Sequence, residues 1–94
     1  MRPPQKTWYL YLLECQDGSI YTGITLDIKA RFKRHKSGKG ARYTRSHRPI
    51  CVLAVAVFVN RASAQRAEYL VKRCPAKRKR EIANQLATGN VVFL

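Results

Sequence analysis

Arg31 and His35 lie four residues apart in a segment that is predicted to form a helix, so their side chains share one helix face. An arginine in such a place can stabilise negative charge on a phosphate, and a histidine can transfer a proton or bind a phosphate oxygen. The same spacing fits an ordinary pair on a basic, solvated helix. The residue types alone leave both interpretations open.

Glu68 stands out among the five acidic residues of the chain. It lies four residues after Ala64 and three before Val71, beside an apolar stripe, where a carboxylate loses hydration unless a cation or a donor meets it. With so few acids, a cluster that holds two metal ions is not expected. One Mg²⁺ held by a single carboxylate, water and a substrate phosphate still fits the sequence. The alternative is an ordinary exposed glutamate that pairs with Lys72 at i+4.

Three tyrosines fall on two predicted strands, and two of them, Tyr9 and Tyr11, share a face because they are two residues apart. Tyrosines on a sheet usually pack half-buried with a solvated hydroxyl. A phenol of Tyr11 or Tyr21 beside an arginine and a metal could instead act as a general base, since positive neighbours would lower its pKa from about 10. Gly23 follows Tyr21 by two residues and indicates a bulge or a close backbone approach.

The charge balance favours a polyanionic partner. Lysine and arginine number 19 against 5 acidic residues, and the stretch 29–48 holds nine of these cations and no acid. Nucleic acid is the commonest polyanion, whereas an anionic membrane is disfavoured because these cations lie on no long amphipathic helix. Within this stretch we expect Lys39, Arg42 and Arg45 to bind the nucleic-acid backbone and Tyr43 to stack on a base. A merely solvated or flexible basic segment is the alternative.

The elements that must position these residues follow from the apolar pattern and the turn signals. Strands are predicted at 8–15 and 20–25, followed by a helix from Asp27 to about Ser37 that ends at Gly38 and faces inward through Ile28 and Phe32. A loop at 38–49 then leads to a strand at 50–59 that is covered on both faces. Two helices follow: one from about Ser63, and one with Pro75 in its first turn that reaches Ala87 and stops at Gly89. The apolar stripe of the first of these two helices consists of Ala64, Ala67, Leu70, Val71 and Cys74. The order is ββαβαα. It predicts an α+β fold with a three-stranded antiparallel sheet flanked by helices, in a single domain over 1–94 with its core at about 7–88.

The cysteines and the apolar runs bear on the compartment. Cys15, Cys51 and Cys74 are widely spaced and form no CxxC pair, so we expect buried free thiols and a reducing, cytoplasmic location. The run at 8–13 is too short for a signal peptide, and the run at 50–59 covers about half of a membrane span.

Taken together, these residues resemble the GIY-YIG endonuclease superfamily, and most closely its small stand-alone branch of bacterial single-domain proteins. Tyr9-Leu10-Tyr11 stands where that family has its first motif, with Tyr9 in place of glycine, and Tyr21-Thr22-Gly23 stands where it has the second, with Thr22 in place of isoleucine. Arg31, His35 and Glu68 match the family's catalytic arginine, a histidine one turn later and its metal-binding glutamate. The most specific match to the small branch is the stretch 37–45. For the family's late asparagine, Asn84 is the nearest candidate.

The resemblance implies that five side chains gather around one divalent cation, Mg²⁺ or Mn²⁺: the catalytic residues Tyr11, Tyr21, Arg31 and His35, and the metal ligand Glu68. It implies a metal-dependent endonuclease that hydrolyses nucleic-acid phosphodiester bonds, DNA rather than RNA. Because no second domain is expected, little sequence specificity is expected either. The alternatives are a non-catalytic DNA- or RNA-binding module on the same scaffold and a nuclease subunit that needs a protein partner for targeting.

Overall fold

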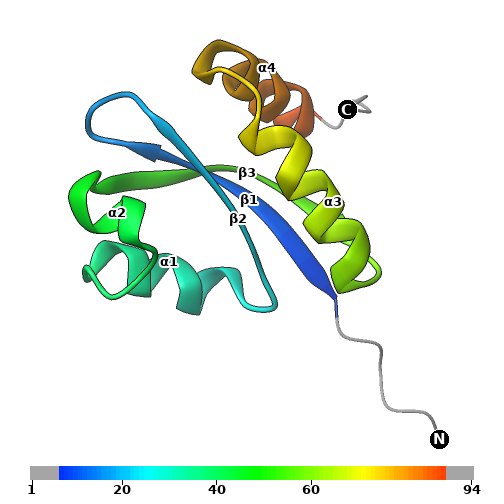
Figure 1. The fold of residues 1–94 in the computed structure, drawn as a ribbon, viewed down its shortest axis with the longest axis horizontal. Helices are drawn as coiled ribbons and strands as arrows, with labels where there is room; N and C mark the ends of the chain where they lie inside the picture. Colours follow the sequence, from blue (N-terminus) through cyan, green and yellow to red (C-terminus); the bar gives the residue numbers. More distant parts are fainter. Residues whose placement is uncertain (1–6, 89–94) are drawn as a thin grey trace, which may run out of the picture.

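The computed structural model describes residues 7–88, and Figure 1 shows their path. The elements are β1 Trp8–Cys15, β2 Ile20–Thr25, α1 Ile28–Lys36, α2 Arg42–Ser46, β3 Pro49–Phe58, α3 Arg61–Lys72 and α4 Ala76–Ala87. The predicted α+β architecture, a three-stranded antiparallel sheet flanked by helices, is confirmed. One element was not predicted, the short helix α2.

The first strand, β1, is the centre of the sheet, whose strand order is β2-β1-β3. Its residues Leu10, Leu12 and Leu13 are buried, because neighbours pair with β1 along both edges. The prediction that the apolar run at 50–59 is covered on both faces was wrong. This run forms the edge strand β3, where Ile50 is exposed and Val57 keeps 66% of its surface in solvent.

Two helical layers enclose the sheet. Figure 1 shows α3 and α4 on one side of it and α1 with α2 on the other. The hydrophobic core lies on the α3 and α4 side, where Leu10 and Leu12 of β1 pack with residues of both helices, including Val71 and Ile82. Side chains alternate along a strand, so Tyr11 points to the opposite side, toward α1.

The helix α1 begins as predicted, but a different residue anchors it. The Asp27 side chain accepts a hydrogen bond from the Ala30 amide at 3.1 Å and caps the helix. We expected Ile28 and Phe32 to face the interior, and both are only half-buried. The buried residue of α1 is His35, at 1% exposure, because the last turn of the helix lies against the sheet at Tyr11.

The segment predicted as a loop at 38–49 contains the helix α2, Arg42–Ser46. The Arg45 amide donates to the Ala41 carbonyl oxygen at 3.2 Å, and the Thr44 hydroxyl donates to the same oxygen at 2.9 Å. A single turn of small and cationic residues carries no apolar periodicity, so the sequence pattern did not reveal it. Thr44 is buried, and α2 thereby holds the segment against α1.

The last two helices match their predictions apart from their first residues. The helix α3 begins at Arg61, two residues before the expected Ser63, because the Asn60 side chain accepts from the Ser63 amide at 2.8 Å and caps the helix. Of its expected stripe, Leu70 is exposed and Cys74 is half-buried. Pro75 stands at the N-cap of α4, just before the first turn where we expected it. The expected stop at Gly89 lies outside the described residues.

The three cysteines are free, as predicted, but only Cys15 is buried; Cys51 and Cys74 are half-buried. Within residues 7–88, no helix is long and apolar enough to cross a membrane.

One arginine fastens α4 to the β1–β2 hairpin. Arg80 Nη1 donates to Glu14 Oε2 at 2.6 Å, and its Nη2 donates to the Gly18 carbonyl oxygen at 2.7 Å. Replacing it in Arg80→Met removes both bonds and keeps most of the apolar stem. We expect the free energy of unfolding to fall by about 1 kcal/mol, which for a domain of this size lowers the melting temperature by about 4–8 °C.

The control is Arg66→Met, which removes an exposed cation on α3 and should change stability by less than about 0.5 kcal/mol. Equal melting temperatures for the two variants in thermal unfolding would show that Arg80 does not fasten the helix.

Candidate functional site

A chain of hydrogen bonds runs from the sheet through α1 to α2. The Tyr11 hydroxyl oxygen lies 2.8 Å from His35 Nε2, and His35 Nδ1 lies 2.6 Å from Thr44 Oγ1. All three side chains are buried, at 2% exposure or less. Two short polar contacts therefore join the strand β1 to the consecutive helices α1 and α2.

The direction of these bonds follows from the single proton of the Thr44 hydroxyl. That proton is donated to the Ala41 carbonyl oxygen at 2.9 Å, so the 2.6 Å contact has His35 Nδ1–H as its donor. The Ala41 amide also approaches Nδ1, at 3.5 Å, but this contact is at the limit of hydrogen bonding and does not outweigh the shorter one. His35 Nε2 then carries a lone pair and accepts the Tyr11 proton.

Burial sets the charge state of this pair. It lowers the pKa of His35 to about 4, with the Arg31 charge acting in the same direction. Burial also raises the pKa of Tyr11 to about 12, against the contact with Arg31, which lowers it. We expected an arginine and a metal together to lower the pKa of a phenol here. Arg31 does act in that direction on Tyr11, but desolvation outweighs it. At neutral pH the protein holds a neutral phenol and a neutral imidazole.

Two glycines leave the space in which this pair fits. A Cβ on Gly23, the cross-strand partner of Tyr11, would meet the Tyr11 ring, and a Cβ on Gly40 would meet Nδ1 and Cα of His35. The close approach predicted at Gly23 is therefore confirmed. It is made by the ring of Tyr11.

The other predicted site residues surround Tyr11. The charges of Arg31 and Glu68 and the phenol of Tyr21 all act on the pKa of Tyr11, and the Tyr11 and Tyr21 ring centroids are 6.2 Å apart. The Tyr21 ring also lies 5.1 Å from the His35 ring. Tyr11, Tyr21, Arg31 and His35 contact one another directly or through Tyr11, and Glu68 of α3 acts on Tyr11 through its charge. These five residues are called the Tyr11 cluster below.

Glu68 keeps 22% of its side chain in solvent and pairs with Lys72, whose Nζ lies 3.4 Å from Glu68 Oε2. Lys72 Nζ also lies 5.8 Å from the Tyr21 ring centroid. The ordinary i+4 pair considered from the sequence therefore forms, and it forms at the edge of the Tyr11 cluster. The role of Glu68 as a metal ligand stays a prediction.

The donor set fits a single hard cation. No group of three or more histidine, cysteine or carboxylate side chains within residues 7–88 could hold a metal ion. One partly solvated carboxylate at Glu68 suits Mg²⁺ or Mn²⁺, which usually keeps several waters and takes further oxygen ligands from a substrate phosphate. A site of two metals does not fit these residues.

The expected nucleic-acid residues lie on and before α2. Lys39, Arg42 and Arg45 are exposed, and the Lys39 carbonyl oxygen accepts from Arg34 Nη2 at 3.3 Å. Tyr43 is partly covered, because it stacks with Tyr21 at 5.9 Å and with His47 at 3.9 Å between ring centroids. It forms an aromatic wall beside the Tyr11 cluster.

Sequence reasoning missed Thr44, which orients His35, and Lys79, which lies beside the same strand as Tyr21. A threonine and a lysine in basic runs give no signal of their own. Asn84 is not part of the cluster; it lines a separate hollow with residues that include Leu53 and Arg80.

Comparisons with known proteins point in one direction. A family model described as the GIY-YIG catalytic domain matches residues 7–81. A UPF0213 protein of Cupriavidus necator is 53% identical over 79 residues, which cover 84% of this chain and 86% of the relative. The solution NMR structure of a UPF0213 protein from Bacillus halodurans is 44% identical, covers 83% of each chain and has a TM-score of 0.53. That of a protein from E. faecalis is 31% identical, covers 99% of each chain and has a TM-score of 0.63.

The buried histidine gives a direct test of this geometry. The pKa of His35 in the folded protein, about 4, lies below the ordinary value of about 6.5, so an NMR titration of its ring protons should show a midpoint near 4. The unfolded chain binds this proton more readily. The stability that neutral His35 contributes is therefore complete above pH 6.5 and is lost as the pH falls from about 6.5 toward 4.

In Gly40→Ala the new Cβ meets His35 Nδ1 and Cα, so the ring must leave its place and its midpoint should rise toward 6.5. The control is Gly38→Ala, where no atom lies within 4 Å but φ is +80°. It should cost about 1 kcal/mol of stability and leave the midpoint unchanged. A wild-type midpoint near 6.5 would contradict the buried, neutral imidazole.

Proposed function

Because the chain belongs to the GIY-YIG catalytic-domain family, we propose that it is a divalent-metal-dependent endonuclease that hydrolyses nucleic-acid phosphodiester bonds, DNA more readily than RNA. The observation that carries this proposal is the buried Tyr11–His35 hydrogen bond, set beside the Arg31 guanidinium and the Glu68 carboxylate. Family membership supports a nuclease-type role. The metal, the substrate and the residue roles are our proposal.

Tyr11 and His35 together offer a path for the proton of an attacking water without forming a free phenolate. Because burial lowers the pKa of His35 to about 4, the imidazole would accept this proton only when a bound phosphate brings negative charge beside it. The Tyr11 oxygen would take the water proton while the Tyr11 proton moves to His35 Nε2, along the 2.8 Å contact. A pKa of Tyr11 raised to about 12 keeps the phenol protonated until a substrate is in place. Tyr21, whose ring lies 5.1 Å from that of His35, is the second phenol within reach and would orient the water.

Glu68 would hold the cation, Mg²⁺ or Mn²⁺, and Lys72 would give up its ion pair with the carboxylate. When bound, such an ion neutralises charge on the phosphate and on the leaving oxygen. Arg31 acts from α1, next to Tyr11, and would stabilise the charge that grows on the phosphate in the transition state.

The basic surface can bind nucleic acid without recognising its base sequence. Lys39, Arg42 and Arg45 are exposed cations beside the Tyr43 wall, and such residues neutralise phosphates whatever the bases are. We therefore propose little sequence preference. The three free thiols fit a reducing compartment, so we propose that the chain acts on nucleic acid inside the cell.

A non-catalytic nucleic-acid-binding module is the second candidate. The observation that favours it is the Glu68–Lys72 ion pair, since a carboxylate that is already neutralised needs no metal. The two candidates differ in what Glu68 does.

The substitution Glu68→Gln should abolish metal-dependent cleavage, because it removes the charge that binds the cation and keeps nearly the same shape. Stability should change by at most about 0.5 kcal/mol, the value of an exposed i+4 pair. Metal-free binding should persist or tighten, because the change removes a negative charge and frees Lys72. Cleavage of a labelled oligonucleotide, thermal unfolding and metal-free binding are measured on the same proteins.

The matched control is Glu81→Gln on α4, which breaks a pair of the same kind, with Arg78 Nη1 at 3.4 Å from Glu81 Oε2. It should leave cleavage intact. Full cleavage by Glu68→Gln would show that Glu68 does not hold a catalytic metal ion. No metal-dependent cleavage by the unmodified chain would favour the binding module.

The substitution Arg31→Ala should lower the cleavage rate by about 10²–10³ and affect binding only slightly, because many other cations hold the backbone while one donor serves the reacting phosphate. The control is Lys33→Ala, an exposed cation on the same helix. Small and equal losses of rate in the two variants would show that Arg31 is an ordinary cation of a solvated helix and has no role in cleavage.

A further inference from the structure

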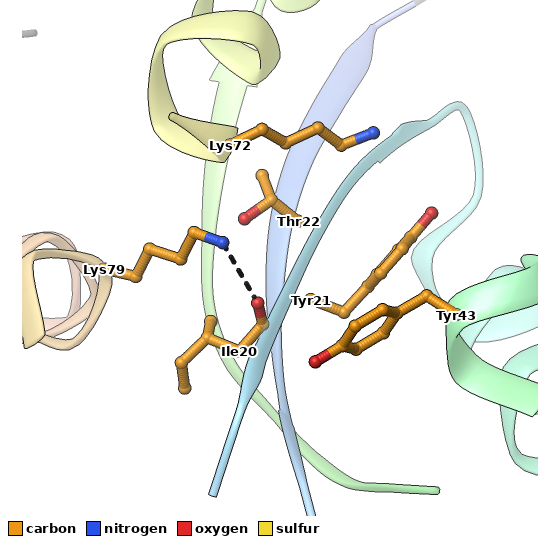
Figure 2. A pocket seen from close by; sticks show the side chains of 6 residues that line it. All are labelled: Ile20, Tyr21, Thr22, Tyr43, Lys72 and Lys79. Atoms are coloured by element: carbon orange, nitrogen blue, oxygen red, sulfur yellow. Dashed lines mark hydrogen bonds between the residues drawn. The ribbon is translucent and has the colours of Figure 1, made fainter. Parts of the chain in front are cut away.

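A hollow of about 350 Å³ opens beside β2, next to the Tyr11 cluster. Figure 2 shows the side chains that line it, which come from β2, α2 and the segments at α3 and α4. They are Ile20, Tyr21, Thr22, Tyr43, Lys72 and Lys79. Small-molecule pockets usually measure about 300–1,000 Å³, so the hollow has room for more than a lone phosphate. It shares Tyr21 with the cluster, and its Lys72 is the ion-pair partner of Glu68.

The ammonium groups of Lys72 and Lys79 line this hollow, and among the described residues one carboxylate, that of Glu68, pairs with one of them. Lys79 Nζ donates to the Ile20 carbonyl oxygen at 3.3 Å, and Lys72 pairs with Glu68. Burial lowers the pKa of Lys79, and the positive charge of Lys72 lowers it further, although the interaction with Cys74 acts the other way. An anion in the hollow would relieve both the desolvation and the repulsion.

Thr22 adds an unused polar group to the same wall. It is 1% exposed, and its Oγ1 has no hydrogen-bond partner among the described residues. Figure 2 shows the Thr22 hydroxyl on the side of the Lys79 ammonium group. A buried hydroxyl without a partner is costly, and buried polar groups in proteins are normally satisfied. A ligand oxygen would satisfy it once the side chains that cover this atom move aside, because the hydroxyl itself is inaccessible.

The aromatic side of the hollow lies across the edge strand β2 from Thr22 and Lys79 (Figure 2). Tyr21 and Tyr43 lie with their rings stacked at an interplanar angle of 26°, and His47 stacks on Tyr43 at 5°. These contacts hold the wall in place before any ligand arrives. Aromatic side chains beside cations are the combination that binds nucleotides without regard to sequence.

We propose that this hollow is a second nucleotide subsite, which takes the nucleotide next to the one whose phosphate is cleaved. Lys79 and Lys72 bind its phosphate, Thr22 donates a hydrogen bond to a phosphate oxygen, and the sugar and base lie against Tyr21 and Tyr43. The proposal rests on the proposed function and names a binding site that the cleavage step does not require.

The test measures binding to the full chain without metal. Deoxyadenosine 5′-monophosphate, deoxyadenosine and inorganic phosphate are titrated separately, and backbone amide signals are followed by NMR. The nucleotide should bind more tightly than either part of it and should shift the amide signals of residues 20–22 and of Tyr43.

Lys79→Met should weaken nucleotide binding about ten-fold, the effect of one charge-assisted hydrogen bond. Thr22→Val, which keeps the shape, should weaken it by a smaller factor and leave the fold intact.

The matched control is Lys77→Met, which removes an exposed cation from the same helix and should change the affinity less than two-fold, within about 0.4 kcal/mol. Equal losses in Lys77→Met and Lys79→Met would overturn the proposal in favour of diffuse attraction. Inorganic phosphate that binds as well as the nucleotide would reduce the hollow to an anion site and overturn it too. Neither result involves metal or cleavage, so failure here leaves the Glu68→Gln outcome standing, and failure there leaves this result standing.

Discussion

The buried contact between Tyr11 and His35 is the constraint on which the rest of the structure depends. A phenol and an imidazole can be buried together at low cost only if each satisfies the other, and the 2.8 Å bond does so. That bond requires the close approach of β1 and α1, which the absence of a side chain at Gly23 and Gly40 permits. It also requires Thr44, which fixes the imidazole by accepting from Nδ1.

The electrostatics of the site follow from the scarcity of acids. The chain has a formal net charge of +14, and Glu68 is the acid that acts on the pKa of Tyr11. This carboxylate pairs with Lys72, which also lines the hollow beside β2. A cation that binds Glu68 would therefore compete with the Lys72 ammonium group.

The sequence predicted every described element except α2, because caps such as Asp27 and apolar periodicity are local signals. The members of the cluster came from the resemblance to the GIY-YIG family, since the spacing of Arg31 and His35 left two interpretations open. Sequence patterns failed where tertiary contacts decide. The apolar run of β3 predicted a strand covered on both faces, yet β3 lies at an edge of the sheet and part of it is exposed. The pKa of Tyr11 depends on burial, which charge spacing does not reveal. The hollow at Thr22 arises from residues that only the fold brings together.

We propose that one carboxylate and one ion suffice for cleavage on this scaffold. The most direct measurement is the initial rate of cleavage by the isolated wild-type chain as a function of free Mn²⁺ concentration, on a fixed oligonucleotide substrate. A single-ion site predicts no cleavage in EDTA and a hyperbolic rise with a Hill coefficient of about 1. Cleavage that persists in EDTA, or a steep dependence with a coefficient of about 2, would contradict the account.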